Sequence, residues 1–203
     1  MKKLRFAIIT GAIVLGAFGA LCAAAQTPPS TQDAGDERLR KVLAAVAGQT
    51  LVAAPFLERR VSPLYASPLE SRGTLSYRPP GTIEKLTTSP IRETLTITTD
   101  TVTIDAGTGA APTVLKLDTQ GQLATYVTGL RAVLAGDDKR LRQAFDTRLT
   151  GSFDHWKLLL TPKGPVPRRG IRQILVSGTG AQLRQIETTE INGDVLDMTI
   201  SAR

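Results

Sequence analysis

The feature that most constrains this chain is the alternation of apolar and polar residues in short segments from residue 51 onward. Leu95 and Ile97 alternate with threonines, and Val102 and Ile104 alternate with polar residues in the next segment. Successive side chains of a β-strand point to opposite faces, so each segment predicts a strand with one apolar and one polar face. An antiparallel sheet commonly packs one face on the core and leaves the other in water. The pattern therefore predicts an antiparallel meander with one buried face.

The last third of the chain has the same character. Strands are expected at 153–161, 171–177, 182–189 and 195–201, and Asn192-Gly193 is the strongest hairpin signal. With the segments between 51 and 105, the expectation is about nine or ten strands and two or three helices. The fold class predicted is α+β, mainly β.

Two segments have the periodicity of a helix instead. The first is expected to be capped by Asp36 and to end at Gly48, with Leu39, Val42 and Leu43 on one apolar face. In the second, Thr119 and Gln122 predict a capping box. Its apolar stripe before Gly136 consists of Leu123, Tyr126, Val127, Leu130 and Leu134.

The N-terminus has the pattern of an export signal. Lys2, Lys3 and Arg5 precede an apolar run that ends in small residues, and alanines 23–25 supply a cleavage pattern. We expect residues 1–25 to be a signal peptide cleaved between Ala25 and Gln26, which places the mature protein in the periplasm of a diderm bacterium. A membrane anchor is the alternative, but the run is shorter than the ~20 residues that span a bilayer.

The remaining chain divides simply. Residues 26–35 lack apolar periodicity and contain two prolines, so they predict a disordered lead-in. Residues 36–203 are long enough for one domain with an ordinary core. The single cysteine, Cys22, lies in the predicted signal, so the mature chain is expected to form no disulfide.

Charge and side-chain inventory argue against several functions. The chain has 25 Lys and Arg against 18 Asp and Glu, and three of the basic residues lie in the signal. The mature excess of four is mild and spread out, which does not indicate nucleic-acid binding. The single histidine, His155, is expected on a surface strand opposite Trp156 and has no catalytic motif or metal-ligand spacing around it. We predict no enzyme, no metal and no cofactor, with a carboxylate pair assembled only in three dimensions as the alternative.

Several segments in order are similar to one known family. Gly73-Thr74-Leu75-Ser76-Tyr77-Arg78-Pro79 resembles its G-x-L-x-x-R-P segment, and 156–163 resembles its strand ending in L-T-P-K. Residues 171–174, 178–181 and 183–190 are similar to its last hairpins. On these residues the chain resembles the outer-membrane lipoprotein carrier (LolA-like) family over nearly the whole mature length.

The resemblance implies an unclosed antiparallel β-barrel, or half-barrel, with a lid of amphipathic helices that opens to admit acyl chains. Arg78 matches the family's arginine that latches the lid by hydrogen bonds to helix carbonyls, and Pro79 matches the proline beside it. The implied lining of the cavity and lid is Leu39, Val42, Leu43, Leu75, Tyr77, Leu95, Ile97, Leu123, Tyr126, Val127, Leu130, Leu158 and Leu160.

The implied partners are an acylated lipoprotein or lipid cargo, an inner-membrane ABC-type release complex and an outer-membrane acceptor, with the carrier itself a monomer. Two departures leave the cargo open. No aromatic residue follows Arg78-Pro79, and the chain has no C-terminal extension past its last strand. The alternatives are therefore a dedicated carrier of another lipid, such as a polyene or glycolipid, or an envelope interaction module with a filled core.

Overall fold

The computed structural model describes residues 31–164 and 170–201. The predicted signal peptide, its cleavage point and residues 26–30 of the predicted lead-in lie outside the described residues. Within the described ranges, no helix is long and apolar enough to cross a membrane.

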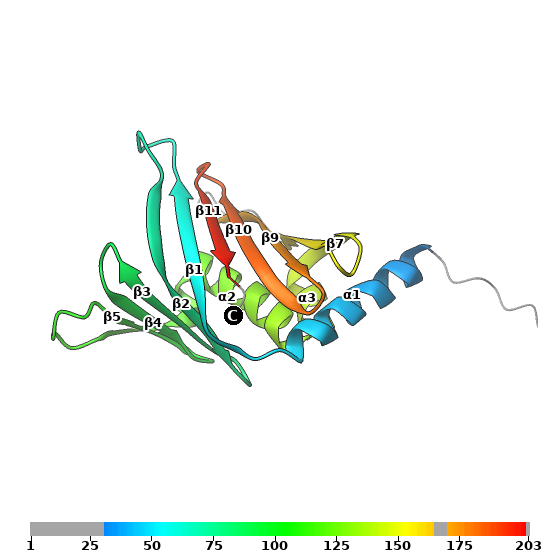
Figure 1. The fold of residues 1–203 in the computed structure, drawn as a ribbon, viewed down its shortest axis with the longest axis horizontal. Helices are drawn as coiled ribbons and strands as arrows, with labels where there is room; N and C mark the ends of the chain where they lie inside the picture. The colour runs from blue at the N-terminus through cyan, green and yellow to red at the C-terminus, as the bar shows by residue number, and fades with distance from the viewer. Residues whose placement is uncertain (1–30, 165–169, 202–203) are drawn as a thin grey trace, which may run out of the picture.

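The strands form a single curved sheet in which every neighbouring pair is antiparallel (Figure 1). Its order is β6-β5-β4-β3-β2-β1-β11-β10-β9-β8-β7. The strands are β1 (Leu51–Val61), β2 (Leu69–Arg78), β3 (Thr82–Ser89), β4 (Glu93–Ile97), β5 (Thr101–Asp105), β6 (Thr113–Lys116), β7 (Phe145–Gly151), β8 (Trp156–Pro162), β9 (Ile171–Thr179), β10 (Gln182–Glu190) and β11 (Val195–Ile200).

The order of the strands explains why the barrel is not closed. The first and last strands, β1 and β11, pair in the middle, whereas β6 and β7 are the two edges. The chain between these edges forms the helices α2 (Gly121–Ala135) and α3 (Asp138–Ala144), and the two edge strands do not pair with each other. The predicted fold class, a mainly β half-barrel with helices, is confirmed.

The helices differ from the sequence predictions in where they begin. The first helix, α1, spans Thr31–Ala47, so residues 31–35 of the predicted disordered lead-in are helical. Apolar periodicity detects only the turns that contact the core, and it therefore places the beginning too late. The predicted capping box is also wrong. Thr119 ends a short 3-10 turn (Leu117–Thr119), where its hydroxyl donates to the Lys116 carbonyl, and α2 has no side-chain cap.

β1 begins at Leu51, where the sequence places the first strand segments, and it continues through Pro55 and a bulge at Ala53, whose φ is 45°. One strand prediction needs correction. His155 lies in the turn before β8, exposed, rather than in the strand. The Asn192-Gly193 hairpin is confirmed: Gly193 has a φ of 94° and joins β10 to β11.

Core residues lie in rows across the sheet, because directly paired residues of neighbouring strands share a face. One such row runs through Met198, Ile186, Val176 and Leu158, all buried. We call the face that carries this row the inner face. At one end of the sheet Trp156 is buried against Gly178, and its indole nitrogen donates to the Gly180 carbonyl at 2.8 Å.

Candidate functional site between α2 and the inner face

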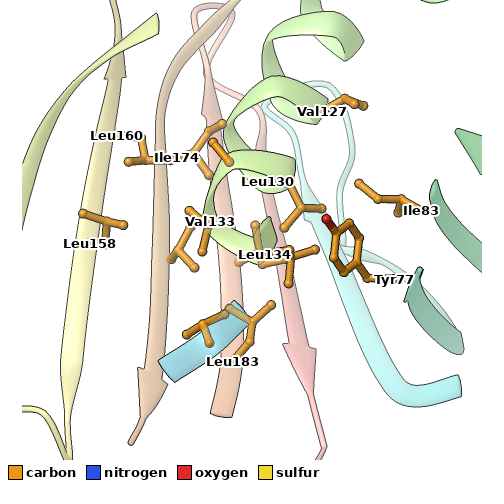
Figure 2. Packing of buried hydrophobic residues seen from close by; sticks show 14 of the residues in the cluster. Tyr77, Ile83, Val127, Leu130, Val133, Leu134, Leu158, Leu160, Ile174 and Leu183 are labelled. Atoms are coloured by element: carbon orange, nitrogen blue, oxygen red, sulfur yellow. The ribbon is translucent and has the colours of Figure 1, made fainter. Parts of the chain in front are cut away.

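Helix α2 lies against the inner face of the sheet, between its two wings (Figure 2). Val127, Leu130, Val133 and Leu134 point from the helix into the core and are buried. On one side of the helix they meet Leu158, Leu160 and Ile174, and on the other Tyr77 and Ile83. The apolar stripe of α2 therefore occupies the surface on which an apolar ligand would have to bind.

All thirteen residues implied as lining of the cavity and lid belong to this one apolar cluster. Leu95, Leu123 and Tyr126 are partly buried at its margin, and the other ten are buried. The structure thus brings the predicted set together as packed core. Whether a ligand replaces any of these contacts stays a prediction.

A glycine allows α2 to approach the sheet closely. A Cβ at Gly129 would lie 3.1 Å from the Phe145 ring, 3.3 Å from Ile174 and 3.4 Å from Leu160. Such contacts are tighter than ordinary packing, so the helix fits against β7, β8 and β9 because residue 129 has no side chain. At Gly129 the helix and the sheet are therefore in close contact.

The other side of α2 is joined to the sheet by an arginine. Arg131 Nε donates to the Gly81 carbonyl in the β2–β3 turn at 2.7 Å, and its Nη2 donates to the Thr98 carbonyl in the β4–β5 turn. Burial, and then the charge of Arg140, lower the pKa of Arg131. A guanidinium has five donors and stays charged, so one side chain can join two separate turns to the helix.

The predicted latch residues lie near this contact but are oriented differently. Arg78 donates to Glu84 on the neighbouring strand at 2.9 Å, and its side chain is 59% exposed. Pro79 is also exposed. The hydrogen bonds that join α2 to the turns are those of Arg131, and a role of Arg78 in opening stays a prediction.

Arg131 was missed in the sequence although a signal exists. It lies four residues after Val127 and three before Leu134, so it falls on the apolar stripe of the helix. A charged residue at a core position needs partners. That requirement was a reason to single it out.

An open groove runs beside this contact. It has a volume of about 500 Å³ and lies between β5, the 3-10 turn and α2, with Ala124 and Thr128 on the helix side and Thr101 and Leu117 opposite. A smaller hollow of about 160 Å³ adjoins it at Gly81, Thr99 and Arg131. Packing between α2 and the sheet is therefore close around Gly129 and looser around Arg131. A further hollow of about 210 Å³ lies at the end of α2, where Leu134 faces Leu183 and Ile200.

Potential metal ligands and the single histidine were located in the described residues. In 31–164 and 170–201, no group of three His, Cys, Asp or Glu could hold a metal ion. His155 is exposed in its turn.

The site therefore consists of a curved antiparallel sheet with an apolar helix packed on its inner face. The chain matches the model of the outer membrane lipoprotein carrier protein LolA-like family over residues 27–202. It therefore belongs to this family, whose members are carriers and in general not enzymes.

Several solved structures are similar to this chain, all at low sequence identity. A LolA superfamily protein from Nitrosomonas europaea is 12% identical, with 83% of this chain and 91% of that chain covered and a TM-score of 0.43. MucB of Pseudomonas aeruginosa, solved in complex with MucA, is 14% identical, with 82% and 55% covered and a TM-score of 0.42. The lipoprotein LppX of Mycobacterium tuberculosis is 12% identical, with 83% and 93% covered and a TM-score of 0.41. No curated protein matches the sequence.

Proposed function

We propose that this protein is a periplasmic carrier that shields the acyl chains of a lipoprotein or another lipid for transfer toward the outer membrane. The observation that carries the proposal is the uneven attachment of α2. Its apolar stripe covers the inner face, packed tightly over β7–β9 but joined to the β2–β5 side through Arg131 beside an open groove. Acyl chains enter on the Arg131 side and replace the apolar contacts of the helix there.

The energies allow this exchange. Burying one methylene contributes about 0.8 kcal/mol, so a sixteen-carbon chain contributes about 12 kcal/mol. The four buried apolar side chains of α2 contribute about 1.5–3 kcal/mol each, about 6–12 kcal/mol in all. Since the two are similar, a bound chain compensates for a displaced helix, and the empty protein closes again after release.

Native mass spectrometry of protein purified from its own periplasm tests the proposal. The expected result is a population carrying lipidated protein or free lipid, and the mass of that adduct decides between a lipoprotein and a dedicated cargo such as a polyene or glycolipid. Protein that stays free of lipid there, and also after incubation with lipid vesicles, would contradict the carrier function and favour an interaction module.

Two arginine variants test how the carrier opens. Arg131→Leu removes the donors to Gly81 and Thr98, so the helix is expected to stay open and the cargo to transfer more slowly to an acceptor. Arg78→Leu is expected to trap cargo in the same way if Arg78 contacts the helix during the cycle. Transfer as fast as wild type by Arg78→Leu would assign the latch to Arg131 alone, and unaltered transfer by both variants would overturn the opening mechanism.

The proposal includes the implied partners. An inner-membrane ABC-type complex would load the carrier and an outer-membrane acceptor would unload it, with the carrier acting as a monomer. Periplasmic fractionation tests where the protein is located. Crosslinking of the native protein tests whether it contacts the two membrane partners and whether it is a monomer.

A further inference from the structure

An ion pair of one buried and one partly buried side chain lies on the inner face, where apolar residues are expected. Lys85 Nζ donates to both carboxylate oxygens of Glu58, at 2.7 and 2.8 Å, and Ser71 donates to the same carboxylate at 3.2 Å. Glu58 is only 9% exposed. The Lys85 ammonium also lies 5.2 Å from the centre of the Phe56 ring. We call Glu58 and Lys85 the inner polar pair.

Strand register places both members on the inner face. Glu58 pairs with Met198, the first residue of the apolar row that continues through Ile186. Lys85 stands between Leu75 and Leu95 in a second row. Each charge therefore interrupts a row of apolar side chains.

A third polar group on this face lacks a partner. Thr188 on β10 is 4% exposed, and its hydroxyl makes no hydrogen bond in the described structure. It pairs with Ile174 on one side and Leu196 on the other, and Leu196 pairs with Arg60, two residues from Glu58. Thr188 therefore adds a donor and acceptor within the same apolar surroundings, across β11 from the polar pair.

Folding stability alone does not explain the inner polar pair and Thr188. Replacing a buried ion pair by apolar residues is often neutral or stabilising, and a buried hydroxyl without a partner costs free energy. Helix α2 lies beside this region, because its apolar side chains meet Tyr77 and Ile83, and Ile83 precedes Lys85 by two residues on the same face of β3 (Figure 2). Burial, and then the charge of Glu58, raise the pKa of Tyr126 on this helix. Displacement of α2 would uncover the polar pair to whatever replaces the helix.

We propose that the inner polar pair and Thr188 bind the neutral hydrogen-bonding linkage of the cargo, an ester, amide or hydroxyl next to its acyl chains. The pair has no net charge, so it favours a neutral polar group over an anionic one. Lys85 supplies a donor to a carbonyl, and Thr188 supplies a donor and an acceptor. The inference rests on the proposed carrier function. It adds that the carrier recognises the polar linkage of the cargo as well as its acyl chains.

The test compares two fluorescent probes of equal chain length, a pyrene-labelled diacylglycerol and a pyrene-labelled alkane, titrated into the full mature protein. Wild type is expected to bind the diacylglycerol more tightly. Glu58→Leu combined with Lys85→Leu is expected to fold with equal or higher Tm, to keep alkane binding, and to lose about ten-fold in diacylglycerol affinity.

Thr188→Val gives a second, independent variant of nearly the same shape. It is expected to raise the Tm slightly while weakening diacylglycerol binding several-fold. The matched control is Arg59→Gln with Glu70→Gln, which removes the 3.2 Å ion pair on the outer, exposed face of β1 and β2. That variant is expected to keep the preference for the diacylglycerol.

The outcomes separate the two proposals. If wild type binds neither probe, the carrier function itself fails. If wild type binds both probes and the inner variants keep the wild-type preference for diacylglycerol, the carrier function stands and the linkage site is wrong.

Discussion

The two wings of the sheet share one inner face but meet the helices in different ways. On the β7–β11 wing the inner residues are mostly apolar and buried, and α2 approaches so closely that a Cβ at position 129 would need its neighbours to shift. On the β2–β6 wing Ile97 and Val102 are equally buried, but Leu95, Ile104 and Leu115 toward its edge are only partly buried. Lys85 interrupts the apolar rows there, and Arg131 adds hydrogen bonds between α2 and two turns.

This difference indicates on which side α2 can separate from the sheet. Dense apolar packing is lost all at once, because a gap of even a fraction of an ångström forfeits much of the contact energy. Hydrogen bonds to turn carbonyls can be exchanged for water at little net cost. We infer that α2 separates first from the β2–β6 wing and that its contacts with the β7–β11 wing are the last to be lost.

The largest expected effect comes from a matched pair of truncations. Leu160→Ala in the β7–β11 wing should lower the free energy of unfolding by about 2–5 kcal/mol, since Leu160 is fully buried. Leu95→Ala in the other wing should cost less than half as much, because Leu95 is only partly buried. Urea unfolding followed by fluorescence of Trp156, the single tryptophan, measures both. Equal losses would break the contrast between the wings.

A smaller effect is expected for Arg131→Leu. The variant loses the two hydrogen bonds that Arg131 donates, which should lower stability by about 1–3 kcal/mol. Most of this loss is expected in the free energy of local opening of α2 rather than of global unfolding. Arg78→Leu, whose partner Glu84 is on the same sheet, should change stability by less than about 1 kcal/mol. If the order of these two losses were reversed, Arg78 rather than Arg131 would hold the closed form.

The smallest effect appears only in alkali. The pKa of Tyr126 is raised above the ordinary 10.0 by burial and then by Glu58, so the folded protein keeps the phenol protonated. Above pH 10 the unfolded chain releases this proton and the folded chain does not, so stability falls as the pH rises. Absorbance titration of wild type minus Tyr126→Phe should show the Tyr126 phenolate only well above pH 10. A normal titration would mean that the Tyr126 side chain on α2 is not buried against the sheet.

The sequence predicted the β7–β11 wing better than the other. Residues such as Ile174, Val176 and Ile186 alternate cleanly, so the strands and the Asn192-Gly193 turn could be placed closely. In β1 the residues Glu58, Arg59 and Arg60 put charge on both faces, which hides the face that is buried. A buried charge such as Glu58 can be recognised only when the partner on the neighbouring strand is known. The sequence of one strand does not determine how it pairs with its neighbours.

The candidate site shows the same limit. The apolar stripe of α2 was predictable from its spacing, because a helix buries one face. The contacts of Arg131 were not, since Gly81 and Thr98 are carbonyl acceptors in two turns that only the folded sheet brings beside the helix. Every residue has a backbone carbonyl, so the sequence does not indicate which carbonyls will accept a hydrogen bond from Arg131.

Hydrogen–deuterium exchange with and without a saturating long-chain diacylglycerol tests the central claim most directly. The account predicts that exchange rises in Gly121–Ala135 and in the turns at Gly81 and Thr98 when lipid binds, while β8, β9 and β10 stay as protected as before. Uniform protection of α2 together with both wings, or opening of β8–β10 along with the helix, would contradict it.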